Sequence, residues 1–284
     1  MTRSHSITTI FFLLTACHSG SVRTEPEPVT DSPEQPAAVS GSHSTITQWS
    51  IQPSAQSQHY QSVTVAIIDL AGTAPAMRDS TLSTIDFSLS IVHEPRTAAY
   101  TSSIEAFGKS GGTRFPQNSI GTNLPFAFTG HITAGQLTVD SLDCNTEISS
   151  ALPVIQRALI VSPTHLEKDM TWTDSTTTSI CSGAVPVSLT AVRSYRVVGE
   201  TKQGETPAIL LERQDRTTST GEGTEGQHRI QIKSQGTGRS TILIDVRSGA
   251  LIEMITVNST TAAVTTSGRT QQFVQSTHER IARK

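Results

Sequence analysis

Residues 227–258 read QHRIQIKSQGTGRSTILIDVRSGALIEMITVN, and this stretch decides the fold class. Ile230 and Ile232 alternate with polar residues, which is the period of a strand with one buried face. Two apolar runs follow, and the residues between them at 247–249 (RSG) predict a tight hairpin turn. The stretch therefore predicts antiparallel β structure with short connections.

The same pattern extends through the rest of the C-terminal half. Short turns and no intervening helix separate the apolar runs, which predicts an antiparallel meander. Each run has one apolar and one polar face, so the sheet is expected to be covered on one side, by a helix, a second sheet or a bound hydrophobic ligand. The predicted strands are 172–180, 185–198, 208–217, 227–234, 240–246, 251–258 and 270–281.

The N-terminal half predicts fewer strands and one helix. Helical spacing of Leu152, Ile155 and Ala158 predicts a helix within 146–161, the only one expected after the N-terminal leader. A glycine-rich connection at 108–121 predicts a mobile surface loop. The fold class is therefore mainly β, a curved antiparallel, half-barrel-like sheet with one short helix. The predicted strands here are 61–70, 82–92, 126–132 and 136–141, with a turn at 134–135.

Composition limits the classes of partner. Hydrophobic residues make up 35% and charged residues 16% of the chain, and the formal net charge is −3. Ser and Thr fill the difference, and Thr favours pleated, half-buried surfaces. No basic stripe runs along the sequence, so a nucleic-acid partner is not expected.

The first 16 residues have the features of a secretory signal. Arg3 supplies the positive charge, and the apolar stretch of residues 7–14 is too short to span a bilayer. The stretch ends in Leu-Thr-Ala before Cys17, which resembles the lipobox of bacterial lipoproteins. The resemblance implies cleavage before Cys17, a diacylglyceryl group on its thiol, and a membrane partner through that lipid anchor.

The residues after the cysteine suggest a location and a tether. His18 follows Cys17 where an Asp resembles an inner-membrane retention signal, which favours the outer membrane with the domain facing the periplasm. Residues 18–46 are rich in Pro, Ser, Thr and Glu and nearly free of apolar side chains, so a disordered tether is expected. The predicted organisation is a signal peptide (1–16), a lipidated cysteine with its tether (17–46) and one β domain (47–284).

Two cysteines remain in that domain. Cys144 and Cys181 would lie in an oxidising compartment after export, where such a pair usually forms a disulfide. A metal or redox pair is the alternative, but their spacing lacks the C-x-x-C signature and no histidine pattern lies nearby.

Two short motifs resemble nucleotide-binding signatures, but the residues around them do not fit that function. Residues 221–226 (GEGTEG) match a dinucleotide fingerprint, but a strand rather than a helix follows, so a polar hairpin is expected. The FGKS of residues 107–110 imitates a P-loop without its first glycine. No nucleophile elbow or zinc motif occurs, and the histidines are scattered. No catalytic residue, metal or cofactor is therefore assigned.

One further cluster carries a family resemblance. Residues 169–174 (DMTWTD) follow PTHL at 163–166 and precede the antiparallel run, as in uncharacterised bacterial envelope lipoproteins. More distantly, residues 145–284 resemble the LolA/LolB type, a half-barrel with helices on its concave face that binds acyl chains. Lys168 departs from the glycine often found there, which puts the turn geometry in doubt. Trp172 itself is expected to be a core aromatic residue.

These observations leave three functional hypotheses. The first is a non-enzymatic envelope lipoprotein whose curved sheet holds a lipid or another hydrophobic ligand. The second is a structural or protein-interaction accessory of an envelope complex. The third, and least favoured, is an exported hydrolase with a site built from residues distant in sequence.

Overall fold

The computed structural model describes residues 48–284 apart from short gaps. The gaps are 53–54, 71–77, 94–96, 112–118, 121–123, 134–135, 141, 145–148, 150, 161, 183–184 and 226. The expected leader, Cys17, the tether and the turn at 134–135 lie outside the described residues, as does most of the connection at 108–121.

The described chain is almost entirely β structure with a single short helix, as the sequence predicted. Among these residues no helix is long and apolar enough to cross a membrane. The elements are β1 (Gln48–Ser50), β2 (Gln58–Leu70), β3 (Arg78–His93), β4 (Thr97–Ser110), β5 (Ser119–Ile120), β6 (Phe126–Thr133), β7 (Gln136–Val139), α1 (Leu152–Ala158), β8 (His165–Glu167), β9 (Thr171–Ser182), β10 (Val185–Gln203), β11 (Thr206–Glu225), β12 (His228–Asp245), β13 (Leu251–Thr266) and β14 (Arg269–Arg283).

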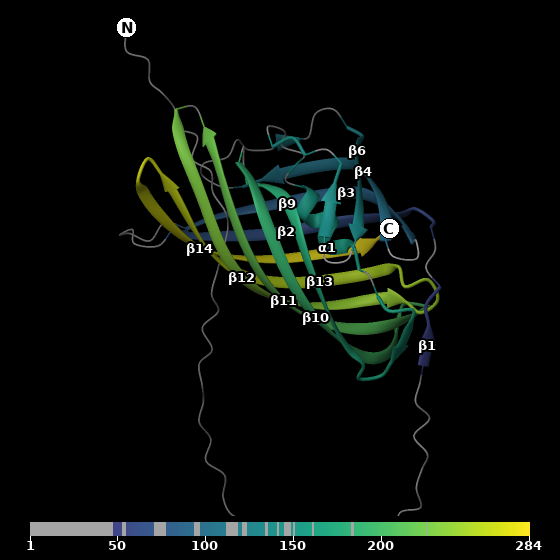
Figure 1. Ribbon diagram of the computed structural model, residues 1–284. Helices are drawn as coiled ribbons and strands as arrows, with labels where there is room; N and C mark the ends of the chain where they lie inside the picture. The colour runs from purple at the N-terminus through teal and green to yellow at the C-terminus, as the bar shows by residue number, and fades with distance from the viewer. Residues whose placement is uncertain are drawn as a thin grey trace, which may run out of the picture.

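All but two of these strands belong to one sheet, so the two halves of the chain form one continuous sheet. The strand order is β3-β2-β14-β13-β12-β11-β10-β9-β7-β6-β4-β5, and β3 also pairs with β4. Apart from the two-residue β5, eleven strands therefore follow one another round a nearly closed, barrel-like sheet, with the long strands side by side in Figure 1. The curvature is greater than the predicted half-barrel.

The ring has two thin joints. A single pair of residues, Gln136 and Thr177, joins β7 to β9, and this is the only parallel contact among the described strands. Two residue pairs join β2 to β3, at Gln58 and His59. Every other neighbouring pair in the ring is a longer antiparallel ladder. Because β2 and β3 still lie closely side by side, the β7–β9 contact is the weakest joint of the closed sheet.

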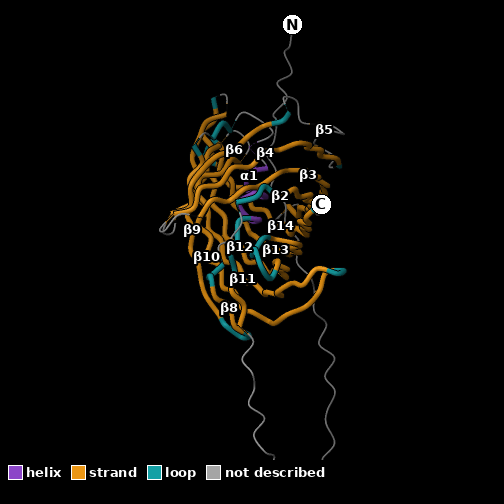
Figure 2. Tube along the Cα trace, turned by 90° about the vertical axis from the view of Figure 1, so that its right-hand side faces the viewer, coloured by secondary structure: helices purple, strands orange, loops and turns teal. Residues whose placement is uncertain are grey.

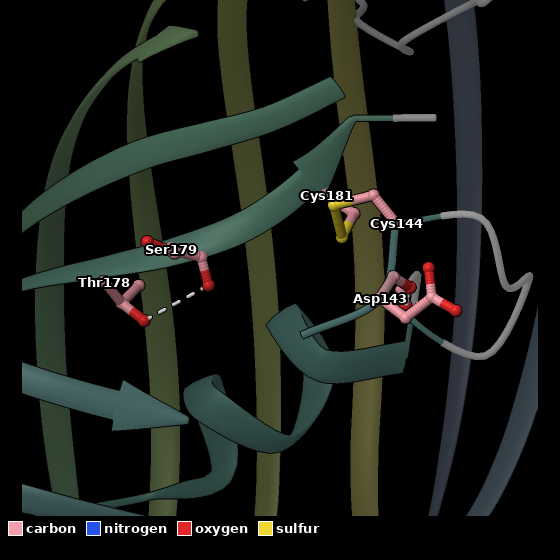
Figure 3. The surroundings of a disulfide bond; sticks show 6 residues. Asp143, Cys144, Thr178, Ser179 and Cys181 are labelled. Atoms are coloured by element: carbon pink, nitrogen blue, oxygen red, sulfur yellow. Dashed lines mark hydrogen bonds between the residues drawn. A yellow bond between two sulfur atoms is a disulfide. The ribbon is translucent and has the colours of Figure 1, made fainter. Parts of the chain in front are cut away.

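The disulfide lies beside the first thin joint. Cys181 is near the end of β9, and Cys144 lies five residues after the last residue of β7. Figure 3 shows the bond joining these two segments next to α1. The pair that the sequence predicted is therefore present, and it links β9 covalently to the segment that follows β7.

Helix α1 lies inside the curved sheet rather than on its outer surface (Figure 2). Leu152 and Ile155 are fully buried, and Pro153 occupies the first turn, where its missing N–H costs no hydrogen bond. The helix packs into one apolar core with side chains from β2, β3, β4, β10, β11, β12, β13 and β14. The cover expected over the apolar face is therefore the chain's own helix.

The hairpin predicted at 247–249 joins β12 to β13. Asp245 Oδ1 accepts hydrogen bonds from the backbone N–H groups of Arg247 and Ser248, at 3.0 and 2.9 Å. Gly249 has φ of +67°, a conformation that glycine adopts without a Cβ clash. These bonds lower the pKa of Asp245 below its ordinary value, against the opposing effect of burial, which is the largest single contribution.

Two strand predictions were wrong. β4 was not predicted at all, and residues 227–234 and 240–246 belong to one strand, β12, instead of two. The C-terminal half therefore contains six long strands, β9 to β14. The GEGTEG motif lies at the end of β11 next to the β11–β12 connection, which agrees with the predicted polar hairpin.

Candidate functional site

The inner face of the sheet is ordered in rows, because the ladder register places inward-facing residues of neighbouring strands opposite one another. Nearest the core is an apolar row: Val197, Leu211, Ile242, Met254 and Ile281. The next row, from β9 to β2, holds Trp172, Tyr195, Arg213, Ser240, Thr256, Glu279 and Thr64. The row beyond it holds Asp174, Arg193, Asp215, Gly238, Asn258, Thr277 and Ala66.

These last two rows are called the polar belt below. With Arg157 of α1, the belt contains three arginines and three carboxylates, so its formal charges cancel. The ion pairs are Arg157–Glu279 at 2.5 Å, Arg213–Asp215 at 2.9 Å and Arg193–Asp174 at 3.5 Å. Such a layer is costly to bury unless its members satisfy one another.

Glu279 is the most completely paired group of the belt. Its side chain is 1% exposed, and it accepts two hydrogen bonds from the Arg157 guanidinium, at 2.5 and 2.7 Å. The hydroxyls of Ser62 and Thr64 donate to the same carboxylate. Burial alone would lower the pKa of Arg157, but the Glu279 carboxylate raises it above its ordinary value.

The ion pair fixes α1 to the far wall of the sheet. Arg157 reaches β14, while the neighbouring Gln156 donates a 3.0 Å hydrogen bond to the Thr178 hydroxyl on β9. The helix thus connects two strands that are separated by β10 to β13 in the sheet. Bidentate charge-assisted bonds are directional, so they set the orientation of the helix as well as its position.

The opposite side of the belt is an aromatic corner. The rings of Trp172 and Tyr195 stack with centroids 4.7 Å apart and planes inclined by 3°. The Tyr195 hydroxyl donates to Asp174 at 3.2 Å, and the Arg213 guanidinium lies 6.0 Å from the Tyr195 ring centroid. Within the described part of the chain, Arg213 Nη1 and Trp172 Nε1 have no hydrogen-bond partner. Buried polar atoms of this kind are commonly bonded to internal water.

Burial raises the pKa of every tyrosine in the chain. It raises the pKa of Tyr60 and of Tyr100 to about 12 and that of Tyr195 as well. Because an unfolded tyrosine ionises near pH 10, the folded protein binds more protons than the unfolded chain above that pH. The free energy of unfolding should therefore fall as the pH rises from about 10 towards 12.

An ultraviolet titration of tyrosinate checks this expectation. At pH 10 the folded protein should show almost no tyrosinate, whereas the chain in guanidinium chloride should show about half of its tyrosines ionised. A folded protein that titrates with a midpoint near 10 would contradict the buried positions of all three rings.

A cavity of about 50 Å³ lies at the α1 end of the sheet. Its lining includes Ile51, Tyr60, Leu89, Ile160 and Leu251. Sites for drug-sized ligands are about 300–1,000 Å³, so this space suits a water molecule or two and not an acyl chain. At this end, α1 and its neighbours occupy the volume that a hydrophobic ligand would need.

The remaining predicted residues are distributed over the sheet. Cys17 lies outside the described residues. Trp172 packs against the edge of the core, as expected for a core aromatic residue. Among the histidines, Nδ1 of His59 lies 3.1 Å from Oε1 of Glu105. Nδ1 of His228 lies 2.9 Å from the hydroxyl of Ser267, which is on an exposed turn. No group of metal-binding side chains occurs in the part of the chain that is described.

Sequence reasoning missed the polar belt. A signal was present in β11, where Arg213 and Asp215 continue the face of the buried Ile209 and Leu211. Charged residues at inward positions of an alternating strand indicate a buried ionic layer. Assigning partners to them requires the register of strands far apart in the sequence.

No family model matches the chain, and no curated protein matches it. Among solved structures, the crystal structure of Pseudomonas aeruginosa OccK2 (OpdF) is similar at a TM-score of 0.27. The match has 4% sequence identity and covers 84% of this chain and 100% of that chain. With a TM-score this low, the similarity supports no conclusion about function.

Proposed function

We propose that this chain is a lipid-anchored, non-enzymatic protein of the bacterial cell envelope, held at the outer membrane and facing the periplasm. Its barrel-like domain acts as a rigid accessory that binds other envelope components through its outer surface. The observation that carries the proposal is the position of α1. The helix lies within the sheet and is fixed there by the Arg157–Glu279 pair, so the chain itself occupies the inner face.

The composition of the outer face supports this proposal. Outward positions of β11 and β12 carry exposed polar and charged side chains, namely Glu212, Gln214, Arg216, Thr218, Thr220, Lys233, Gln235, Thr237, Arg239 and Thr241. Such a surface suits water and protein partners. Sheets that face lipid chains present an apolar band instead.

Native mass spectrometry separates this proposal from a ligand carrier. The domain from residue 47, exported to a periplasm and purified without detergent, should have the mass of the bare chain less two hydrogens for the disulfide. A discrete added mass matching a phospholipid or acyl chain would overturn the proposal, because the inner face would then hold a ligand.

Site-specific photo-crosslinking tests the accessory role in cells. A photoreactive residue at the outward-facing Thr218 should give a discrete crosslinked product, and one at the fully buried Thr256 should give none. If photoreactive residues at the outward positions gave no crosslinked product, the proposal would be contradicted. The anchor has its own test, since a high-salt wash should release Cys17→Ser, but not the parent protein, from the membrane fraction.

A further inference from the structure

One region of the outer face differs from the polar surface around it. Val65 on β2 and Ile255 and Val257 on β13 are 42%, 37% and 52% exposed, among the largest values for apolar residues in the described chain. The register places Val257, His278 and Val65 side by side on β13, β14 and β2. Val257 and Val65 therefore flank the exposed His278, and Ile255 lies two residues from Val257 on the same face, so the three apolar residues lie in one region of the outer surface.

Two basic residues adjoin this group. Arg239 on β12 is the register partner of Val257, and Arg216 on β11 pairs with Thr237, two residues from Arg239. Both side chains are exposed. Val65, Ile255, Val257, Arg216 and Arg239 are called the outer patch below.

The two arginines of the outer patch differ from other exposed arginines of this face. Arg196, Arg229 and Arg280 form ion pairs with Glu212, Glu222 and Glu253, at 3.0, 2.6 and 2.6 Å. Arg216 and Arg239 have no acidic partner among the residues that the structure describes. The patch thus combines exposed apolar groups with positive charge that the protein does not itself neutralise.

We propose that the outer patch docks on the anionic surface of a lipid bilayer. Uncompensated guanidinium groups complement anionic headgroups, and exposed Val and Ile side chains can enter the headgroup boundary. The inference rests on the proposed envelope location. A tether of the expected length holds the domain near the bilayer at a high effective concentration, so a weak contact suffices to orient it.

Vesicle co-sedimentation tests the proposal with the unlipidated chain from residue 18, which contains every described element. The protein should sediment with vesicles of phosphatidylcholine and phosphatidylglycerol, less so at high salt, and not with phosphatidylcholine alone. The full sequence has a net charge of −3, and the chain from residue 18, which lacks Arg3, has −4; this charge opposes binding, so binding would report a local surface. Failure to bind, or equal binding to both compositions, would overturn the proposal.

A matched pair of variants localises the contact. Arg216→Gln/Arg239→Gln should weaken binding about 25-fold, because each basic residue at an anionic surface contributes about fivefold. Arg229→Gln/Arg269→Gln removes the same charge from hairpin ends about ten residues away along the strands, roughly 30 Å and beyond the screening length. An equal loss in both variants would overturn the proposal. A ligand found by native mass spectrometry would instead refute the accessory role alone.

Discussion

Replacement of Arg157 by leucine is expected to lower the free energy of unfolding by about 3–5 kcal/mol at neutral pH. The substitution keeps an apolar stem on α1 but leaves the Glu279 carboxylate, which is 1% exposed, without its cation. The hydroxyls of Ser62 and Thr64 remain as donors but carry no charge. Chemical denaturation followed by tryptophan fluorescence measures the change.

Two further variants show whether the effect belongs to the ion pair. Arg196→Leu breaks an exposed pair with Glu212 and should cost less than about 1 kcal/mol. The double variant Arg157→Leu/Glu279→Gln should regain much of the stability, because a neutral amide can still accept from both hydroxyls. If the free energy of unfolding of Arg157→Leu lies within about 1 kcal/mol of the parent's, the pair does not hold α1 in place.

Removal of the disulfide is expected to have the second large effect. Cys144→Ser/Cys181→Ser opens a loop of 37 residues that contains α1. In the chain-entropy model, a loop of this size stabilises the fold by about 4 kcal/mol. The bond also spans the β7–β9 joint, where a single residue pair connects the strands. Hydrogen exchange of β7 and β9 should therefore accelerate before the rest of the sheet is affected.

Reduction of the parent protein provides the control. Excess dithiothreitol should bring the parent to the stability of the serine variant and should leave the variant unchanged. Stability that is the same with and without reductant would mean that the β7–β9 joint does not depend on the covalent link.

The hairpin, the helix and most strands could be predicted because their signals are local. The two strands predicted at 227–234 and 240–246 are one strand, β12, and two glycines lie in the stretch between them. A Cβ at Gly238 would lie 2.0 Å from Asn258 Oδ1, and one at Gly236 would lie 2.3 Å from Thr260 Oγ1. Polar side chains of β13 occupy the space that a Cβ would need. Glycine at these two positions therefore lets β12 run on without a break while β13 packs against it.

The closure of the sheet and the polar belt could not be predicted in the same way. β4 contains few large apolar residues outside Tyr100, Ile104 and Phe107, so its period is faint in the sequence. Arg157 and Glu279 are separated by 122 positions, and only the path of the sheet brings them together. Alternation identifies which residues face inward, but the ladder register decides which of them meet.

The pairing of β14 with β2 has a consequence for how the molecule comes into being. One edge of β2, the first long strand, stays unpaired until β14 is present. The contact between the two segments extends to Lys284, whose N–H donates to the His59 carbonyl. Contacts this remote in sequence make folding slow. A nascent chain emerging N-terminus first would expose β2 as an open, apolar edge until β14 has been synthesised, which invites aggregation. We therefore expect the polypeptide to need a holding chaperone, and to acquire its native structure only after release.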